Sequence, residues 1–231
     1  DGSLIILLTA DGSSARIADF NGNVYLNSEL NGQFTTTLSF SQKGSFAGIG
    51  FIDGRYYLLN NKGQILYKAI APLATIVKGI AIDDSGNYAM VHCGNSKKDY
   101  IVGINIAKQK TFTYELSAPH YIKTSMAINA AGKALFLDID KLLEIDIKGK
   151  EVTSYQIIKK RYGQSQISSA GDIFMISYPI HSGGSIWYVW QWGKGILYQR
   201  EFYEELFLHH ILLQNIILLQ GQDMLMCFSY H

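Results

Sequence analysis

The sequence has few of the residues that mark cross-linked, disordered or strongly charged proteins. Its 231 residues include 2 cysteines and 3 prolines, and 17% of them are charged. Cys93 and Cys227 form no Cys-x-x-Cys pair, so their spacing argues against a disulfide framework or a zinc knuckle. We expect two free thiols, buried or half-buried. The formal net charge of +1 gives no global attraction to nucleic acid, and no nucleic-acid partner is predicted.

Long hydrophobic runs are also missing. The most apolar stretch, residues 206–219, is interrupted by His209, His210, Gln214 and Asn215, and it is too short and too polar to span a bilayer. The chain does not open with a charged segment followed by an apolar one, so no signal peptide is predicted. We expect no membrane insertion, and the compartment stays open.

Catalytic motifs are scarce as well. The sequence has no Gly-x-Ser-x-Gly elbow, no P-loop and no His-Glu-x-x-His motif. His92, His120 and His181 have no fixed metal-ligand spacing, so we expect isolated histidines and not a metal site. No catalytic residue and no cofactor is predicted, and a binding role is favoured over an enzyme.

A repeated pattern is what the sequence does contain. Six segments share one motif, in which an apolar residue and three small or polar residues precede a glycine. The first segment is cut off by the start of the chain, and the last has Asn215 in place of the glycine. The marker positions 2, 44, 86, 132, 171 and 215 are 42, 42, 46, 39 and 44 residues apart. A period of about 40 to 45 residues built from strands is typical of a β-propeller, in which each repeat folds as one four-stranded blade.

The strand segments fit an all-β propeller of about six blades, with strands A to D running from inside to outside. Residues 164–167, for example, are expected to form strand A of the fifth repeat. The first blade lacks its inner strand and the last blade lacks its outer strand; the alternative is a seven-bladed ring completed by residues outside this chain. Residues 1–231 are interpreted as one propeller domain within a longer protein.

One segment fits two structures. Residues 202–219 are rich in Leu and Glu and would also suit an amphipathic helix. Their place in the repeat favours strands, because helix propensity is only a weak prior.

The turn motifs resemble those of known propeller repeats. The segment Asp83-Asp-Ser-Gly86 precedes an apolar strand, and Asp19-Phe-Asn-Gly22 precedes Val24 and Tyr25. In these motifs the chain is similar to the WD40-like repeats of the quinoprotein-like and TolB-type propeller superfamilies. The resemblance implies the architecture alone, because the Gly-His and Trp-Asp dipeptides of WD40 repeats and the Trp-docking motifs of quinone-binding propellers do not recur.

The connections between strands B and C and between D and A differ most from repeat to repeat, and they share one face of a propeller. Variable loops on a rigid scaffold are the usual place for binding. We expect a partner-binding patch here, formed by Lys97, Lys98, His120, Tyr121, Lys123, Lys159, Lys160, Arg161, Tyr162 and His181. Such a basic and aromatic patch suits a protein partner with an acidic surface, with this chain as one subunit of an assembly. The alternative is an enzyme or small-ligand binder that uses the central channel.

Trp187, Trp190 and Trp192 lie on one predicted strand. Alternation places Trp190 and Trp192 on one side and Trp187 on the other. Packing between blades is favoured over a sugar-stacking platform, because aromatic side chains supply much of the buried area of a core.

Overall fold

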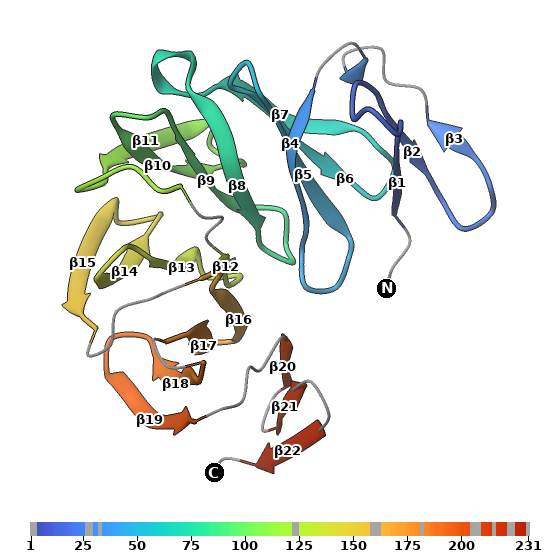
Figure 1. The fold of residues 1–231 in the computed structure, drawn as a ribbon. Helices are drawn as coiled ribbons and strands as arrows, with labels where there is room; N and C mark the ends of the chain where they lie inside the picture. Colours follow the sequence, from blue (N-terminus) through green and yellow to red (C-terminus); the bar gives the residue numbers. More distant parts are fainter. Residues whose placement is uncertain are drawn as a thin grey trace. The chain divides into compact units, whose positions relative to one another are not determined.

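The computed structural model describes residues 4–25, 30–31, 34–121, 125–157, 163–180, 183–203, 209–213, 216–220 and 225–229. This part of the chain consists of strands, turns and the short 3₁₀ segment η2 (Pro72–Ala74) (Figure 1). Within it, no helix has the length and apolar character needed to cross a membrane. The all-β prediction is therefore confirmed.

The strands form six antiparallel sheets, each made of strands that follow one another in sequence. The first sheet contains β1 (Ile5–Leu8), β2 (Ala15–Ala18) and β3 (Val24–Tyr25). The second contains β4 (Thr35–Phe40), β5 (Phe46–Phe51), β6 (Arg55–Asn60) and β7 (Ile65–Ile70). The third contains β8 (Ile76–Ile82), β9 (Tyr88–Gly94), β10 (Asp99–Asn105) and β11 (Lys110–Glu115).

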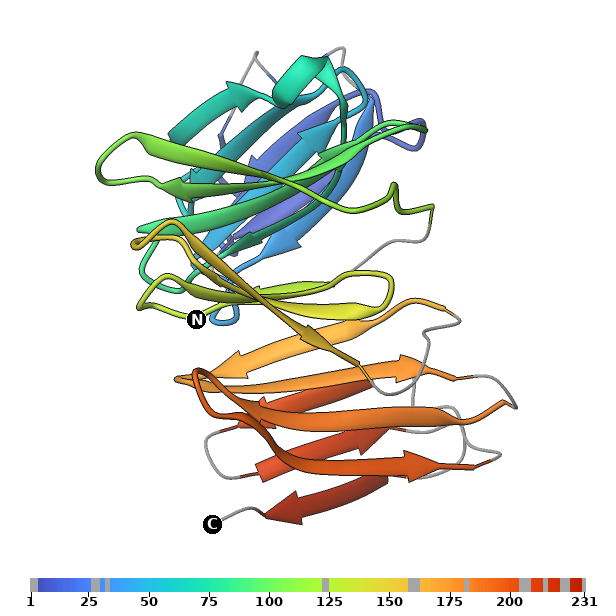
Figure 2. The ribbon, with the colours of Figure 1, turned by 90° about the vertical axis from the view of Figure 1, so that its left-hand side faces the viewer.

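The remaining sheets repeat the plan. The fourth contains β12 (Met126–Ile128), β13 (Lys133–Leu137), β14 (Lys141–Asp146) and β15 (Glu151–Gln156). The fifth contains β16 (Gln166–Ala170), β17 (Ile173–Pro179), β18 (Ser185–Gln191) and β19 (Gly195–Phe202). The sixth contains β20 (His209–Leu213), β21 (Ile216–Gln220) and β22 (Leu225–Ser229), and Figure 2 shows these last two sheets.

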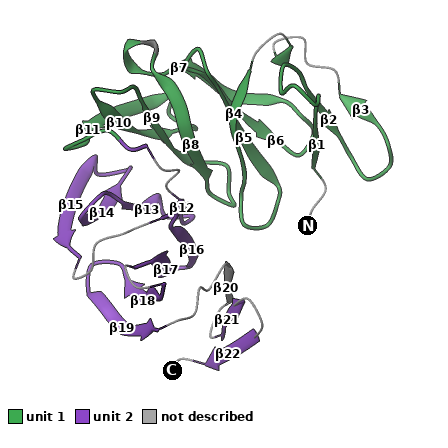
Figure 3. Cartoon of the chain, viewed as in Figure 1, with its two compact units in different colours: residues 1–119 green, residues 120–231 purple. Residues whose placement is uncertain are grey.

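The strand plan agrees with the one predicted from the repeat. Four sheets have four strands, while the first sheet has no inner strand and the last has no outer strand among the described residues. The chain divides into two compact units, residues 1–119 with the first three sheets and residues 120–231 with the last three (Figure 3).

In the first unit, the middle strands of each sheet supply the core. Every residue of β10 and almost every residue of β9 is buried, because other strands flank them in the sheet and apolar side chains cover both faces. Neighbouring sheets approach closely at β5, where Gly48 and Gly50 leave room for Ile80 and Val77 of β8. A Cβ at either glycine would collide with those side chains, so the small residues set the spacing between the sheets.

In the second unit, the tryptophans are part of the core, as predicted. Tyr188 and Trp190 pack on one side of β18, and Trp187 packs on the other side against Phe202. Trp192 is half-buried beside the first group. The aromatic strand therefore holds sheets together and offers no exposed stacking platform.

Strand β16 runs to Ala170, beyond the predicted end at residue 167, because Gly171 with a φ of 60° allows a two-residue turn directly after it. Apart from a bend at Tyr203, the described parts of residues 202–219 are strands, so the helix alternative is wrong there. Both cysteines are free and Cys93 is buried, as predicted. The prediction of a buried or half-buried thiol is wrong for Cys227, which is exposed because it lies on the outer strand of a three-stranded sheet.

Candidate functional site

Four of the ten predicted partner-binding residues belong to the described part of the chain: Lys97, Lys98, His120 and Tyr121. The other six lie outside the described residues and stay predictions: Lys123, Lys159, Lys160, Arg161, Tyr162 and His181.

Lys97 and Lys98 lie at the tip of the β9–β10 hairpin, in the first unit. The side-chain oxygen of Asn95 accepts hydrogen bonds from the backbone N–H groups of Lys97, at 2.8 Å, and Lys98, at 3.0 Å. The Asn95 N–H in turn donates to the carbonyl of Lys98 at 2.9 Å. Such Asx-type bonds hold a turn in one conformation, so the two lysines stand on an ordered tip.

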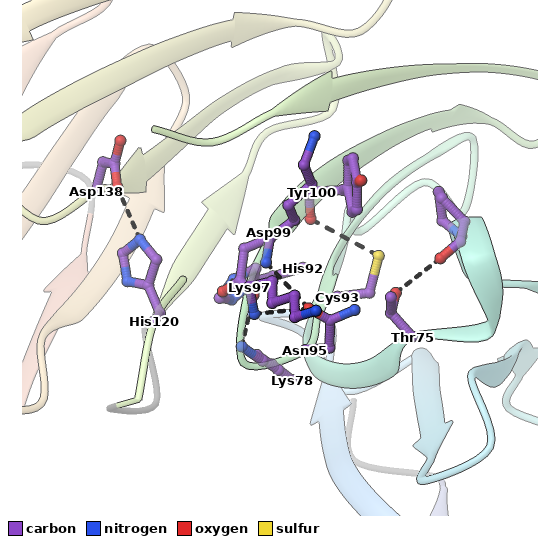
Figure 4. A network of polar contacts seen from close by, with 12 residues as sticks. Thr75, Lys78, His92, Cys93, Asn95, Lys97, Asp99, Tyr100, His120 and Asp138 are labelled. Carbon is purple, nitrogen blue, oxygen red and sulfur yellow. Dashed lines mark hydrogen bonds and ion pairs between the residues drawn. The ribbon is translucent and has the colours of Figure 1, made fainter. Parts of the chain in front are cut away.

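The base of the hairpin is held by a buried carboxylate. Asp99 has no exposed surface, and its two oxygens lie 2.6 Å from Lys78 Nζ and 2.8 Å from His92 Nε2 (Figure 4). Gly94 faces this carboxylate, where any Cβ would collide with it. A buried carboxylate requires such partners, because desolvation of an unpaired charge is costly. His92 is thus a structural residue.

The positive charge of the tip is partly compensated. Lys98 Nζ lies 2.8 Å from Glu115, and that hydrogen bond raises the pKa of Lys98. Both side chains are about half exposed, so the pair contributes little stability. Among the described residues no carboxylate pairs with Lys97, which leaves one uncompensated lysine on the hairpin.

In the second unit, His120 and Tyr121 differ sharply. His120 is 4% exposed, and its Nε2 lies 2.7 Å from Asp138 Oδ1. Its ring packs edge-on against Phe136. This burial takes His120 away from the accessible surface, so it supports the sheet and not a partner contact. Tyr121, the next residue, is 80% exposed.

The histidines do not form a metal site in the described part of the chain. His92 and His120 each face an aspartate, and no described group of three His, Cys, Asp or Glu side chains is placed to hold a metal ion.

The first unit has an apolar surface that the sequence did not reveal. Large apolar side chains are exposed in or beside its B–C and D–A connections, next to β4, β6, β7 and β8. These side chains, which we call the apolar strip, are Phe34, Ile52, Ile70, Leu73 and Ile76, with exposed fractions of 57%, 50%, 62%, 80% and 39%.

Backbone hydrogen bonds join the loops that carry the strip. The Ile52 N–H donates to the Phe34 carbonyl at 3.0 Å, and the Ala71 N–H donates to the Gly54 carbonyl at 2.8 Å. Ile76 pairs with Gly94, the last residue of β9, which directly precedes the tip of the β9–β10 hairpin with Lys97 and Lys98; we call this hairpin the lysine hairpin. The strip and the hairpin tip are therefore connected through one hydrogen-bonded edge of the unit.

Leu73 has an unusual backbone. It adopts a φ of 55° and a ψ of 26°, the left-handed region that a leucine rarely occupies. Thr75 holds this turn, because its backbone N–H and its hydroxyl both donate to the Pro72 carbonyl, at 3.2 Å and 2.9 Å. Leu73, the most exposed apolar residue of the strip, therefore lies on a turn whose backbone is held by hydrogen bonds.

Comparisons with known proteins identify the fold. No protein-family model matches the sequence, and no curated protein matches it. The structure is similar to the β-propeller domain of Cps50 (Swd1) from Myceliophteria thermophila, with a TM-score of 0.56 and 14% identity over 84% of this chain and 66% of that one. It is also similar to the WD40 repeats of RRP9, with a TM-score of 0.52 and 13% identity over 73% of this chain and 51% of that one.

The chain therefore spans about two thirds of the first of these structures and half of the second. Identities this low establish the fold alone. The repeat, the antiparallel four-stranded sheets and these likenesses agree, and the chain has the fold of a WD40-type β-propeller.

Proposed function

We propose that the chain is a non-enzymatic propeller that binds a protein partner through its B–C and D–A connections, as one subunit of an assembly. The observation that carries the proposal is the apolar strip in the first unit. Most single exposed apolar residues need no explanation, but several on joined loops mark an interaction surface. WD40 propellers commonly serve as protein-interaction scaffolds, which agrees with this role.

The composition of the surface fits a protein partner. Interfaces place apolar side chains at the centre and polar groups at the rim. Here Leu73 and Ile52 supply the centre, and Lys97 lies on the hairpin that adjoins it. Covering one large apolar side chain, such as Leu, Ile or Phe, contributes about 1.5–3 kcal/mol, so burying two or three side chains of the strip supplies a large part of a typical binding free energy.

Charge has a smaller role in the described part of this surface than the sequence suggests. Glu115 compensates the charge of Lys98. A partner protein with an acidic surface would therefore meet one uncompensated lysine, Lys97, on the hairpin. A rim lysine acts mainly on the association rate and its salt dependence. The six predicted residues outside the described part, with Tyr121, remain candidates for a basic and aromatic extension of the contact.

Site-specific photo-crosslinking tests the proposal. A photoreactive amino acid replaces Leu73 in one variant and Phe20 in another, and both are expressed in the source cells. Phe20 is a matched control, because it is 71% exposed in the same unit but lies in a C–D turn. We expect one protein to crosslink at position 73 and not at position 20. Equal crosslinking at both positions would contradict the proposal.

A further inference from the structure

The chain between β7 and β8 makes one turn, residues 72–75, which we call the Leu73 turn. Leu73 occupies the left-handed region there, which crowds a Cβ against the backbone and is normally left to glycine. Gln109 and Lys150 also adopt a positive φ, but both are polar residues in turns between a third and a fourth strand. Residues other than glycine keep this conformation only where the surrounding structure imposes it, and they gather at binding sites.

The side chain of Leu73 does not select this conformation. It is 80% exposed, whereas Ala71 and Thr75, two residues before and after it, are each 3% exposed. An exposed side chain gains no buried contact from one backbone conformation over another, so the conformation comes from the buried residues that flank it. The turn thus directs one apolar side chain outward from a backbone that is anchored at both ends.

Thr75 anchors the turn at its second end. Its backbone N–H and its hydroxyl both donate to the Pro72 carbonyl, at 3.2 Å and 2.9 Å. The same hydroxyl reaches Cys93 on β9 (Figure 4): burial raises the pKa of that thiol, and a hydrogen bond with Thr75 opposes the rise. One buried hydroxyl therefore closes the turn and joins it to the neighbouring strand.

We propose that Thr75 is a positioning residue for partner binding. Its hydroxyl holds Leu73 in the conformation in which an apolar pocket on the partner protein receives the leucine side chain, while Thr75 itself touches no partner atom. A projecting apolar side chain fits such a pocket, the setting in which the residues that dominate binding are found. The inference rests on the proposed function, because that function gives Leu73 a partner.

Preorganisation sets the size of the effect. A protein whose binding-competent conformation is only partly populated binds more weakly by that fraction, and ordering a loop on binding lowers affinity. The net contribution of one hydroxyl-to-carbonyl hydrogen bond corresponds to about a threefold to tenfold change in an equilibrium constant. Removing the Thr75 hydroxyl should therefore weaken partner binding about threefold to tenfold, although no contact with the partner is removed.

Hydrogen exchange of the chain alone tests whether the hydroxyl holds the turn. Thr75→Val keeps the side-chain shape and the backbone bond to Pro72 but removes the hydroxyl, and Thr75→Ser keeps the hydroxyl. Relative to its intrinsic rate, we expect the amide of residue 75 to exchange about threefold to tenfold faster in Thr75→Val and unchanged in Thr75→Ser. Thr36→Val is the control, because it removes a hydroxyl that donates to the Val77 carbonyl, at 2.6 Å, and not to the turn. Unchanged exchange in Thr75→Val would overturn the proposal.

Affinity tests whether the held turn serves binding. The ligand is the protein that crosslinks at position 73, titrated calorimetrically against each variant. We expect about threefold to tenfold weaker binding for Thr75→Val, wild-type binding for Thr75→Ser, and no further loss when Thr75→Val is added to Leu73→Ala. Equal losses with and without the Leu73 side chain would show a merely structural role and overturn the proposal.

The two proposals fail in different ways. Selective crosslinking at position 73, together with equal affinities of the wild-type chain and Thr75→Val, would leave the proposed function standing and overturn the positioning role alone. A lack of selective crosslinking at position 73 would reject the proposed function and the positioning role together.

Discussion

The indole Nε1 of Trp190 donates a 2.7 Å hydrogen bond to Oε1 of Glu144, which joins the fourth and fifth sheets across 46 residues of sequence. Glu144 is 4% exposed, and it also accepts from the backbone N–H of Gly193, at 3.0 Å, and the hydroxyl of Tyr155, at 3.0 Å. A single buried carboxylate therefore links two sheets of the second unit.

Replacing Glu144 should destabilise the second unit. Glu144→Ala leaves the buried indole N–H of Trp190 without its acceptor, which costs about 1–3 kcal/mol. The N–H of Gly193, an exposed residue, also loses this acceptor and adds less, because water can replace it. Glu144→Gln keeps an acceptor oxygen and should cost less. Urea unfolding followed by tryptophan fluorescence measures the change. Glu151→Ala, at an exposed carboxylate in the same unit, is the control. Equal loss in Glu144→Ala and Glu151→Ala would show that the link contributes nothing.

Asp99 should be needed for the order of the lysine hairpin. Asp99→Ala leaves Lys78 and His92 beside a buried gap, and breaking a buried ion pair costs about 3 kcal/mol or more. We expect faster hydrogen exchange at the amides of residues 95–98 as well as lower stability. Asp53→Ala removes an exposed pair with Arg55 and should cost under about 1 kcal/mol. Unchanged exchange at the tip in Asp99→Ala would rule out the anchoring role.

The two cysteines should differ in reactivity. Burial raises the pKa of the Cys93 thiol to about 11, so at pH 8 roughly one thiol in a thousand is ionised. Cys227 is exposed. Titration of the native protein with a thiol reagent should give one fast equivalent, which Cys227→Ser abolishes, and a second only after unfolding. Two equivalents at equal rates would show that Cys93 is accessible.

Asp146 should contribute a small pH-dependent stability. Burial alone would raise the pKa of its carboxyl, but hydrogen bonds from Lys133 and the Gly149 N–H lower that pKa below its ordinary value of 3.8. A lowered pKa gives stability that is present above the ordinary value and lost as the pH falls through the folded value. Asp146→Asn should therefore lower the free energy of unfolding at pH 7, by under about 1 kcal/mol since the pair is partly exposed, and leave it unchanged near pH 2. An equal loss at both pH values would contradict this explanation.

The sheets could be predicted because their signals are local. Gly44, Gly86 and Gly132 all adopt positive φ, between 69° and 79°, after turns that Asp83 or Asn129 caps in the later repeats. A glycine after a capping residue is visible in the sequence, and in these three repeats it fixes the turn between the first and second strands of the sheet.

The candidate site could be predicted only in part, because it depends on contacts between residues that lie far apart in the sequence. His120 resembles a surface loop histidine in the sequence, and only its contact with Asp138, 18 residues later, shows that it is buried. The apolar strip combines residues from three connections, which no periodicity joins. The available signal was a large apolar residue inside a loop, such as Leu73 after Pro72, where polar residues are expected.

The central claim is that the apolar strip binds a protein partner. Its most direct test is the affinity, measured by calorimetric titration, of the protein that crosslinks at position 73 for the wild-type chain and for the variants Leu73→Ser and Phe20→Ser. Loss of a buried leucine contact, about 1.5–3 kcal/mol, predicts a tenfold to hundredfold weaker affinity for Leu73→Ser and an unchanged affinity for Phe20→Ser. Equal affinities of the wild-type chain and Leu73→Ser would contradict the claim.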